Sequence, residues 1–83
     1  MKIKTFKAEY ELVEFSHYID HSHDEPVSVI DLIIRTNDID YLIDELGNLF
    51  AIETDKHSYV FSGYELSEYY EVGEGLVKVV CIK

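Results

Sequence analysis

The stretch from residue 39 to residue 54, IDYLIDELGNLFAIET, decides the fold that the sequence predicts. Two short apolar runs flank residues 45–48, where Gly47 and Asn48 are the residue types that tight hairpin turns favour. Side chains alternate along a strand, so a two-residue and a four-residue loop place the same apolar side chains on one face: Tyr41, Ile43, Phe50 and Ile52. We therefore predict a β-hairpin here that seeds the core.

Length and composition indicate one small domain over residues 1–83. The hydrophobic fraction of 47% is enough for one compact core, and seven tyrosines among many β-branched residues favour strands. Cys81 is the single cysteine, so no disulfide can form within the chain. No apolar run reaches the roughly 18 residues of a membrane span. We expect a cytoplasmic protein that needs no cofactor.

The net charge of −10 is unevenly distributed along the chain. Three lysines make the first eight residues basic, whereas residues 9–55 hold thirteen acids and one arginine. Such an acidic surface repels nucleic acids and anionic membranes, and it attracts basic proteins. We therefore expect a basic protein partner and no direct contact with nucleic acid or membrane.

Two stretches before residue 39 have strand character. Residues 4–13 alternate between apolar and polar side chains, and a change of parity at Val13 predicts a bulge or the end of the strand. Residues 27–34 are nearly all apolar, which favours a strand buried on both faces, with a helix as the alternative. The polar residues 16–25 between them predict a loop or a single helical turn.

Three further strands are expected after residue 54. Residues 58–62 and 76–82 are short strand-like runs, and a Gly-rich turn precedes the second. Residues 64–71 alternate as a strand does, although Ser62 and Glu65 match a capping box and leave a short helix open. The predicted fold is therefore mainly β: a single-domain antiparallel sheet, meander or small barrel of about six strands, with room for one short helix.

A group of histidines offers the one candidate metal site. If residues 16–24 formed a helical turn, His17 and His21 would share one face at a spacing that chelates Zn²⁺ or Ni²⁺. His23 lies next to them, and Asp20 or Asp24 would supply a further ligand. A metal-binding or metal-stabilised domain is therefore an alternative function, beside the simpler interpretation of a solvated polar loop.

The sequence provides little else for catalysis. It lacks a Gly-rich phosphate loop, a nucleophile elbow and a CxxC motif. Asp31 lies in an apolar run, so it either faces outward on an edge strand or is buried with a shifted pKa. Cys81 lies in a strand-like run, where a buried and unreactive thiol is expected. We predict that the protein is not an enzyme.

Acidic and aromatic side chains give the preferred candidate site. Glutamates or aspartates two apart on a strand lie roughly 6.6 Å apart on one face, which is close to the spacing of phosphates along a nucleic-acid strand. Tyrosine provides a large contact area with little loss of entropy. The predicted partner-binding residues are Glu9, Glu11, Asp38, Asp40, Tyr64, Glu65, Glu68, Tyr69, Tyr70 and Glu71.

In size, acidity, its lone cysteine and its lack of catalytic motifs, the chain is similar in type to small phage-encoded inhibitors. Anti-CRISPR proteins and uracil-DNA glycosylase inhibitors are examples. The similarity is one of overall character and implies a DNA mimic that blocks the basic site of a nuclease or another nucleic-acid enzyme. A second alternative is a self-associating subunit, a homodimer joined through an edge strand at residues 4–13 or 76–82.

Overall fold

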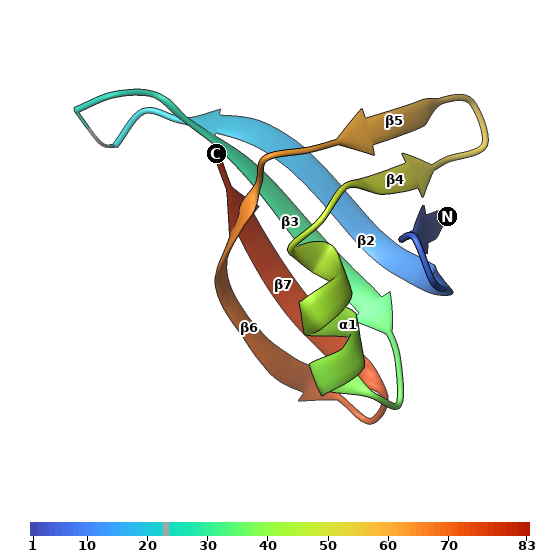
Figure 1. Cartoon of the computed structure of the whole chain (residues 1–83). Helices are drawn as coiled ribbons and strands as arrows, with labels where there is room; N and C mark the ends of the chain where they lie inside the picture. Colours follow the sequence, from blue (N-terminus) through green and yellow to red (C-terminus); the bar gives the residue numbers. More distant parts are fainter. Residues whose placement is uncertain (23) are drawn as a thin grey trace.

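Seven antiparallel strands form one open sheet in the computed structural model, which describes residues 1–22 and 24–83 (Figure 1). The strand order is β5-β4-β1-β2-β3-β7-β6, so β5 and β6 are the two edges. The strands are β1 (Lys2–Lys4), β2 (Glu9–Asp20), β3 (Val27–Arg35), β4 (Phe50–Glu53), β5 (Ser58–Phe61), β6 (Glu65–Gly73) and β7 (Leu76–Ile82). The predicted mainly β fold is confirmed, as an open sheet rather than a closed barrel.

The predicted hairpin over residues 39–54 is wrong in its first half, which forms helix α1 (Ile39–Leu46). The Asp38 side chain accepts a hydrogen bond of 3.1 Å from the Tyr41 N–H, which caps the helix N-terminus. Apolar side chains also recur at the i, i+3, i+4, i+7 spacing of a helix, at Ile39, Leu42, Ile43 and Leu46. The helical period therefore prevails over the shorter strand-like alternation.

The side chains that α1 buries differ from those that the predicted hairpin would bury. Leu42 is 0% exposed and lies in the core, whereas Tyr41, predicted to be in the core, is 42% exposed. Glu45, predicted to lie in a turn, is buried and accepts a 3.0 Å hydrogen bond from the Thr5 hydroxyl. The second half of the predicted hairpin does form a strand, β4. Its alternate side chains Phe50 and Ile52 enter the core as expected.

Helix α1 packs on one face of the sheet, which we call the inner face (Figure 1). The predicted strand at residues 27–34 is confirmed as β3, and the alternative helix there does not form. Its predicted burial on both faces is wrong, because Asp31 and Ile33 on the outer face are only half-buried. Alternate residues of β3 and β7 point inward, and Leu42 and Leu46 of α1 cover them. The inward side chains of the two strands are Ile30, Leu32, Ile34, Val77, Val79 and Cys81.

Strand β2 extends well beyond the segment that the sequence predicts. A register shift between Leu12 and Glu14 confirms the bulge expected at Val13. Residues 16–20, predicted as a loop or helical turn, continue the strand instead, because each of them pairs with a residue of β3. The hydrogen bonds to an apolar neighbouring strand thus override the polar local sequence.

Candidate protein-binding surface

Strand β6 is a long, open edge of the sheet. It pairs with β7 on one side only, and it has nine residues where the opposite edge, β5, has four. Seven of its nine residues have a partner in β7, and two register shifts interrupt this pairing, at Leu66/Glu68 and at Glu71/Gly73. Apart from the half-buried Leu66, all its residues are exposed. An open edge of this kind can accept a further strand.

The first bulge decides which face each β6 side chain occupies. Cross-strand partners share a face, so Glu68 lies opposite Val80 on the outer face, and Tyr69 lies opposite Val79 on the inner face. Tyr70 is opposite Lys78 and therefore faces outward, while Glu71 is opposite Val77 and faces inward. The predicted row of glutamates and tyrosines is thus divided between the two faces of one edge.

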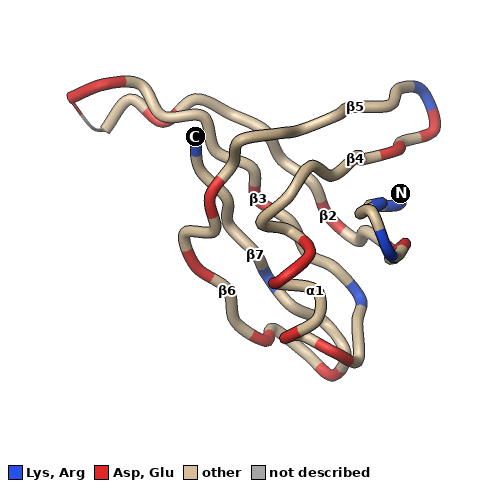
Figure 2. The backbone as a smooth tube through the Cα atoms, viewed as in Figure 1, with Lys and Arg blue, Asp and Glu red and all other residues tan. Residues whose placement is uncertain are grey.

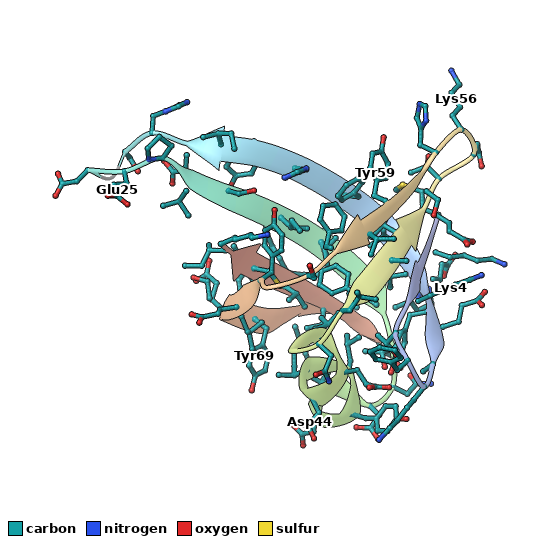
Figure 3. All side chains as sticks on the ribbon, turned by 45° about the horizontal axis from the view of Figure 1, so that its top comes forward. Lys4, Glu25, Asp44, Lys56, Tyr59 and Tyr69 are labelled. Atoms are coloured by element: carbon teal, nitrogen blue, oxygen red, sulfur yellow. The ribbon has the colours of Figure 1, made fainter. Side chains whose placement is uncertain are left out.

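Tyr69 and Tyr70 are the most accessible aromatic residues of this edge. They are 45% and 49% exposed, and Tyr69 projects away from the sheet (Figure 3). Tyr64, the third predicted anchor, differs from them, because its ring packs against the core beside Phe61. Its hydroxyl lies 2.7 Å from the Ser28 Oγ. We therefore limit the candidate surface, the β6 edge, to Glu65, Glu68, Tyr69, Tyr70 and Glu71.

The glutamates of the β6 edge have no ion pair within the part of the chain that the structure describes. On the opposite side of the sheet, β1 brings lysines next to the acids of its two neighbours (Figure 2). Lys2 lies 3.1 Å from Glu9, and Lys4 lies 3.1 Å from Glu53. The uncompensated negative charge is therefore displaced away from β1.

Four more of the predicted contact residues lie outside the β6 edge, and three of them make contacts within the chain. Glu9 is paired with Lys2, and the hydrogen bond from that lysine lowers the pKa of the Glu9 carboxyl. Glu11 accepts a 2.7 Å hydrogen bond from Arg35. The prediction that Asp38 and Asp40 lie on a strand is wrong. Asp38 is the N-cap of α1, and Asp40 lies in the first turn of that helix.

The predicted metal site lacks the helical turn on which it depends. His17 lies within β2, where four residues along a strand span roughly 13 Å, so its i, i+4 relation to His21 does not bring the two rings together. Among residues 1–22 and 24–83, no three histidine, cysteine or acidic side chains are grouped as metal ligands. His23 lies outside the described residues.

His17 belongs to a polar cluster at the end of the core. Its Nε2 atom lies 3.1 Å from the Ser28 Oγ and 3.4 Å from the Tyr64 hydroxyl, and its ring meets Phe61 edge-on at 5.3 Å. A serine beside a histidine is the first pair of a nucleophilic triad, which also needs a group that orients the histidine. Within the described chain, no carboxylate hydrogen bonds to His17. These contacts thus join β2 and β3 to Tyr64, the residue that precedes β6.

Two other residues of interest are held by the sheet. Asp31 faces outward, but on a central strand, and it pairs with Lys78 at 3.5 Å, so neither predicted environment describes it. Cys81 is buried as predicted, and burial raises the pKa of its thiol to about 11. At neutral pH the reactive thiolate is therefore scarce.

The sequence did not predict the exposure of one aromatic residue, Phe6. Phe6 is 76% exposed, in the turn between β1 and β2. The alternation of residues 4–13 assigns it to the apolar face of a strand, but the chain turns there because the Thr5 N–H donates to the Ala8 carbonyl at 2.8 Å. Only the pairing of β1 with β2 reveals this turn.

No family model matches the chain, and no curated protein or solved structure is significantly similar to it. In the described chain, the helix present is too short to cross a membrane.

Proposed function

We propose that this chain is a non-enzymatic binding module that docks a basic protein along the β6 edge. The observation that supports it most directly is the charge on that edge. Glu65, Glu68 and Glu71 are exposed and have no ion pair in the described structure, whereas Glu9, Glu11 and Glu53 are paired. A partner that supplies lysine or arginine would therefore complete the ion pairs of β6.

The open edge suggests how the partner would bind. An extended segment of the partner would add a strand to β6 through backbone hydrogen bonds. Its basic side chains would then meet glutamates on both faces, with Tyr69 and Tyr70 as the central anchors. A partner whose basic site normally holds a polyanion, such as a nuclease or another nucleic-acid enzyme, has the required charge. Binding would block that site.

A second copy of the chain fits this edge less well. The homodimer predicted through residues 4–13 or 76–82 is wrong in its location, because β2 and β7 both have strands on either side. Two copies of β6 pairing with each other would bring Glu65, Glu68 and Glu71 of both copies into one seam, where like charges are unfavourable. The charge of the edge therefore favours a basic partner of a different sequence.

The same glutamates also have a purely protective explanation. Charged side chains on an edge strand prevent sheets from joining edge to edge, without any partner. The two explanations differ in one consequence. Removing the charges would abolish specific capture of a basic protein if the edge binds, but would only promote aggregation if the charges are protective.

The test is affinity capture from lysate with the tagged chain, followed by elution with increasing salt and mass spectrometry. The test variant is Glu65→Gln/Glu68→Gln/Glu71→Gln. The matched control, Glu14→Gln/Asp44→Asn/Asp55→Asn, removes the same charge from exposed acids elsewhere. We expect a nucleic-acid enzyme that the wild type and the control capture, that the test variant loses, and that elutes as salt rises. Equal capture by both variants would overturn the proposal.

A further inference from the structure

A pocket of about 620 Å³ opens on the outer face of the sheet, the face opposite to α1. It lies where the β2–β3 hairpin extends beyond the other strands (Figure 1). Four elements and the hairpin loop contribute to it. We call it the hairpin pocket, and its lining residues are Tyr18, Asp20, Asp24, Glu25, Val27, Val29, Ser67, Val80 and Ile82.

The floor of the hairpin pocket is apolar because of the strand register. Tyr18, Val29 and Ile82 are cross-strand partners in one row over β2, β3 and β7, and Val80 lies in the next row. Val29 is only 4% exposed although it faces away from α1. The outer face thus has a sheltered apolar surface at this end, where a one-layer sheet normally has polar side chains.

The rim of the same pocket is acidic. Asp24 and Glu25 lie in the exposed loop of the hairpin, with Glu25 at the far end of the molecule (Figure 3). Asp20 lies at the end of β2, and its carboxylate accepts hydrogen bonds from the Ser22 N–H and hydroxyl. Among the described lining residues there is no lysine or arginine. An apolar floor with an anionic rim is complementary to a cation carried on an apolar body.

We propose that the hairpin pocket binds a small organic cation, an amine with an aromatic or branched aliphatic body. The volume lies within the roughly 300 to 1,000 Å³ of typical small-molecule sites and exceeds the needs of a single lysine side chain. The body of the ligand would cover Val29, Val80 and Ile82, and its ammonium group would face Asp24 and Glu25. The site borders strand β6 through Ser67, but none of the five residues of the β6 edge lines it, and the proposal does not depend on the function proposed for that edge.

The experiment is an NMR titration of the ¹³C-methyl-labelled, ¹⁵N-labelled chain with three probes of the same body. These are 4-phenylbutylamine, 4-phenylbutanol and 4-phenylbutyrate. We expect the amine to shift the methyl signals of Val27, Val29, Val80 and Ile82 with saturation, the alcohol to bind more weakly, and the carboxylate to leave them unchanged. Equal binding of all three probes would overturn the role of the rim, and no saturable shift would overturn the site.

Two variants with the same change in net charge test whether the rim of the hairpin pocket binds the ammonium group. Asp24→Asn/Glu25→Gln removes two rim charges, and Asp55→Asn/Glu74→Gln removes two exposed charges that do not line the pocket. Exposed ion contacts contribute modestly, so we expect about fivefold weaker binding of the amine for the first variant and no change for the second. Equal weakening by both would show attraction by net charge alone and refute the site.

Discussion

Residues 39–46 form helix α1 where the sequence predicts a hairpin strand, and this difference allows a direct test of the fold. The helix and the strand bury different side chains of two neighbouring residues. In the structure, Leu42 is completely buried against the sheet and Tyr41 is partly exposed. In the predicted hairpin, Tyr41 would face the core and Leu42 the solvent. The substitutions Leu42→Ala and Tyr41→Ala therefore distinguish the two arrangements.

The magnitude follows from the burial of each side chain. Truncating a fully buried leucine to alanine costs roughly 2 to 5 kcal/mol of the free energy of unfolding, and we expect about 3 kcal/mol at Leu42. A domain of this size has a total of roughly 4 to 12 kcal/mol, and 1 kcal/mol corresponds to about 4 to 8 °C in Tm. Leu42→Ala should thus lower Tm by about 12 to 24 °C. Tyr41→Ala should cost less than about 1 kcal/mol, since alanine also favours the helix.

Thermal and urea unfolding followed by circular dichroism would measure both variants beside the wild type. The refolded spectrum and the urea m-value serve as controls, because both should stay unchanged if each variant keeps the native fold. A loss of stability in Tyr41→Ala equal to or greater than that in Leu42→Ala would refute the helical assignment and the packing of α1 on the sheet.

Three further predictions concern single side chains. Asp38→Ala removes the N-cap of α1 and should cost about 1 kcal/mol in urea unfolding, whereas Asp38→Asn, which keeps an acceptor, should cost less; equal losses would argue against the cap. Cys81, with its pKa raised to about 11, should react with a thiol reagent at pH 7.5 only when the protein unfolds, and fast labelling of the native protein would contradict its burial. The pKa of the Glu9 carboxyl is lowered in the folded chain. The contribution of Glu9 to stability is therefore fully present above the pKa that this carboxyl has in the unfolded chain, and it is lost as the pH falls through the pKa in the folded chain. Lys2→Met should return that pKa toward its ordinary value in an NMR titration, and an unchanged pKa would show that Lys2 is not the cause.

Several parts of the fold could be read from the sequence because the local pattern favours one interpretation over its alternative. The apolar runs of β3 and β7 match strands buried on the inner face, and the change of parity at Val13 marks a real bulge. Residues 39–46 are different, since their apolar residues fit both an alternating strand and a helix. The inner face of β3 and β7 needs a cover, and only the helical arrangement places Leu42 and Leu46 on the same face as Ile39 and Ile43.

The candidate surface depended even more on the tertiary structure. The sequence identified the β6 glutamates and tyrosines as a group, but the bulge at Leu66/Glu68 decided their faces. The sequence could not show that Glu9 is compensated while Glu68 is not. That difference arises because the sheet order places β1 and its lysines beside β2 and β4 and far from β6. Residue types and strand periodicity are local properties, so they could be predicted from the sequence. Which charges meet is set by strand order, a non-local property that only the folded sheet determines.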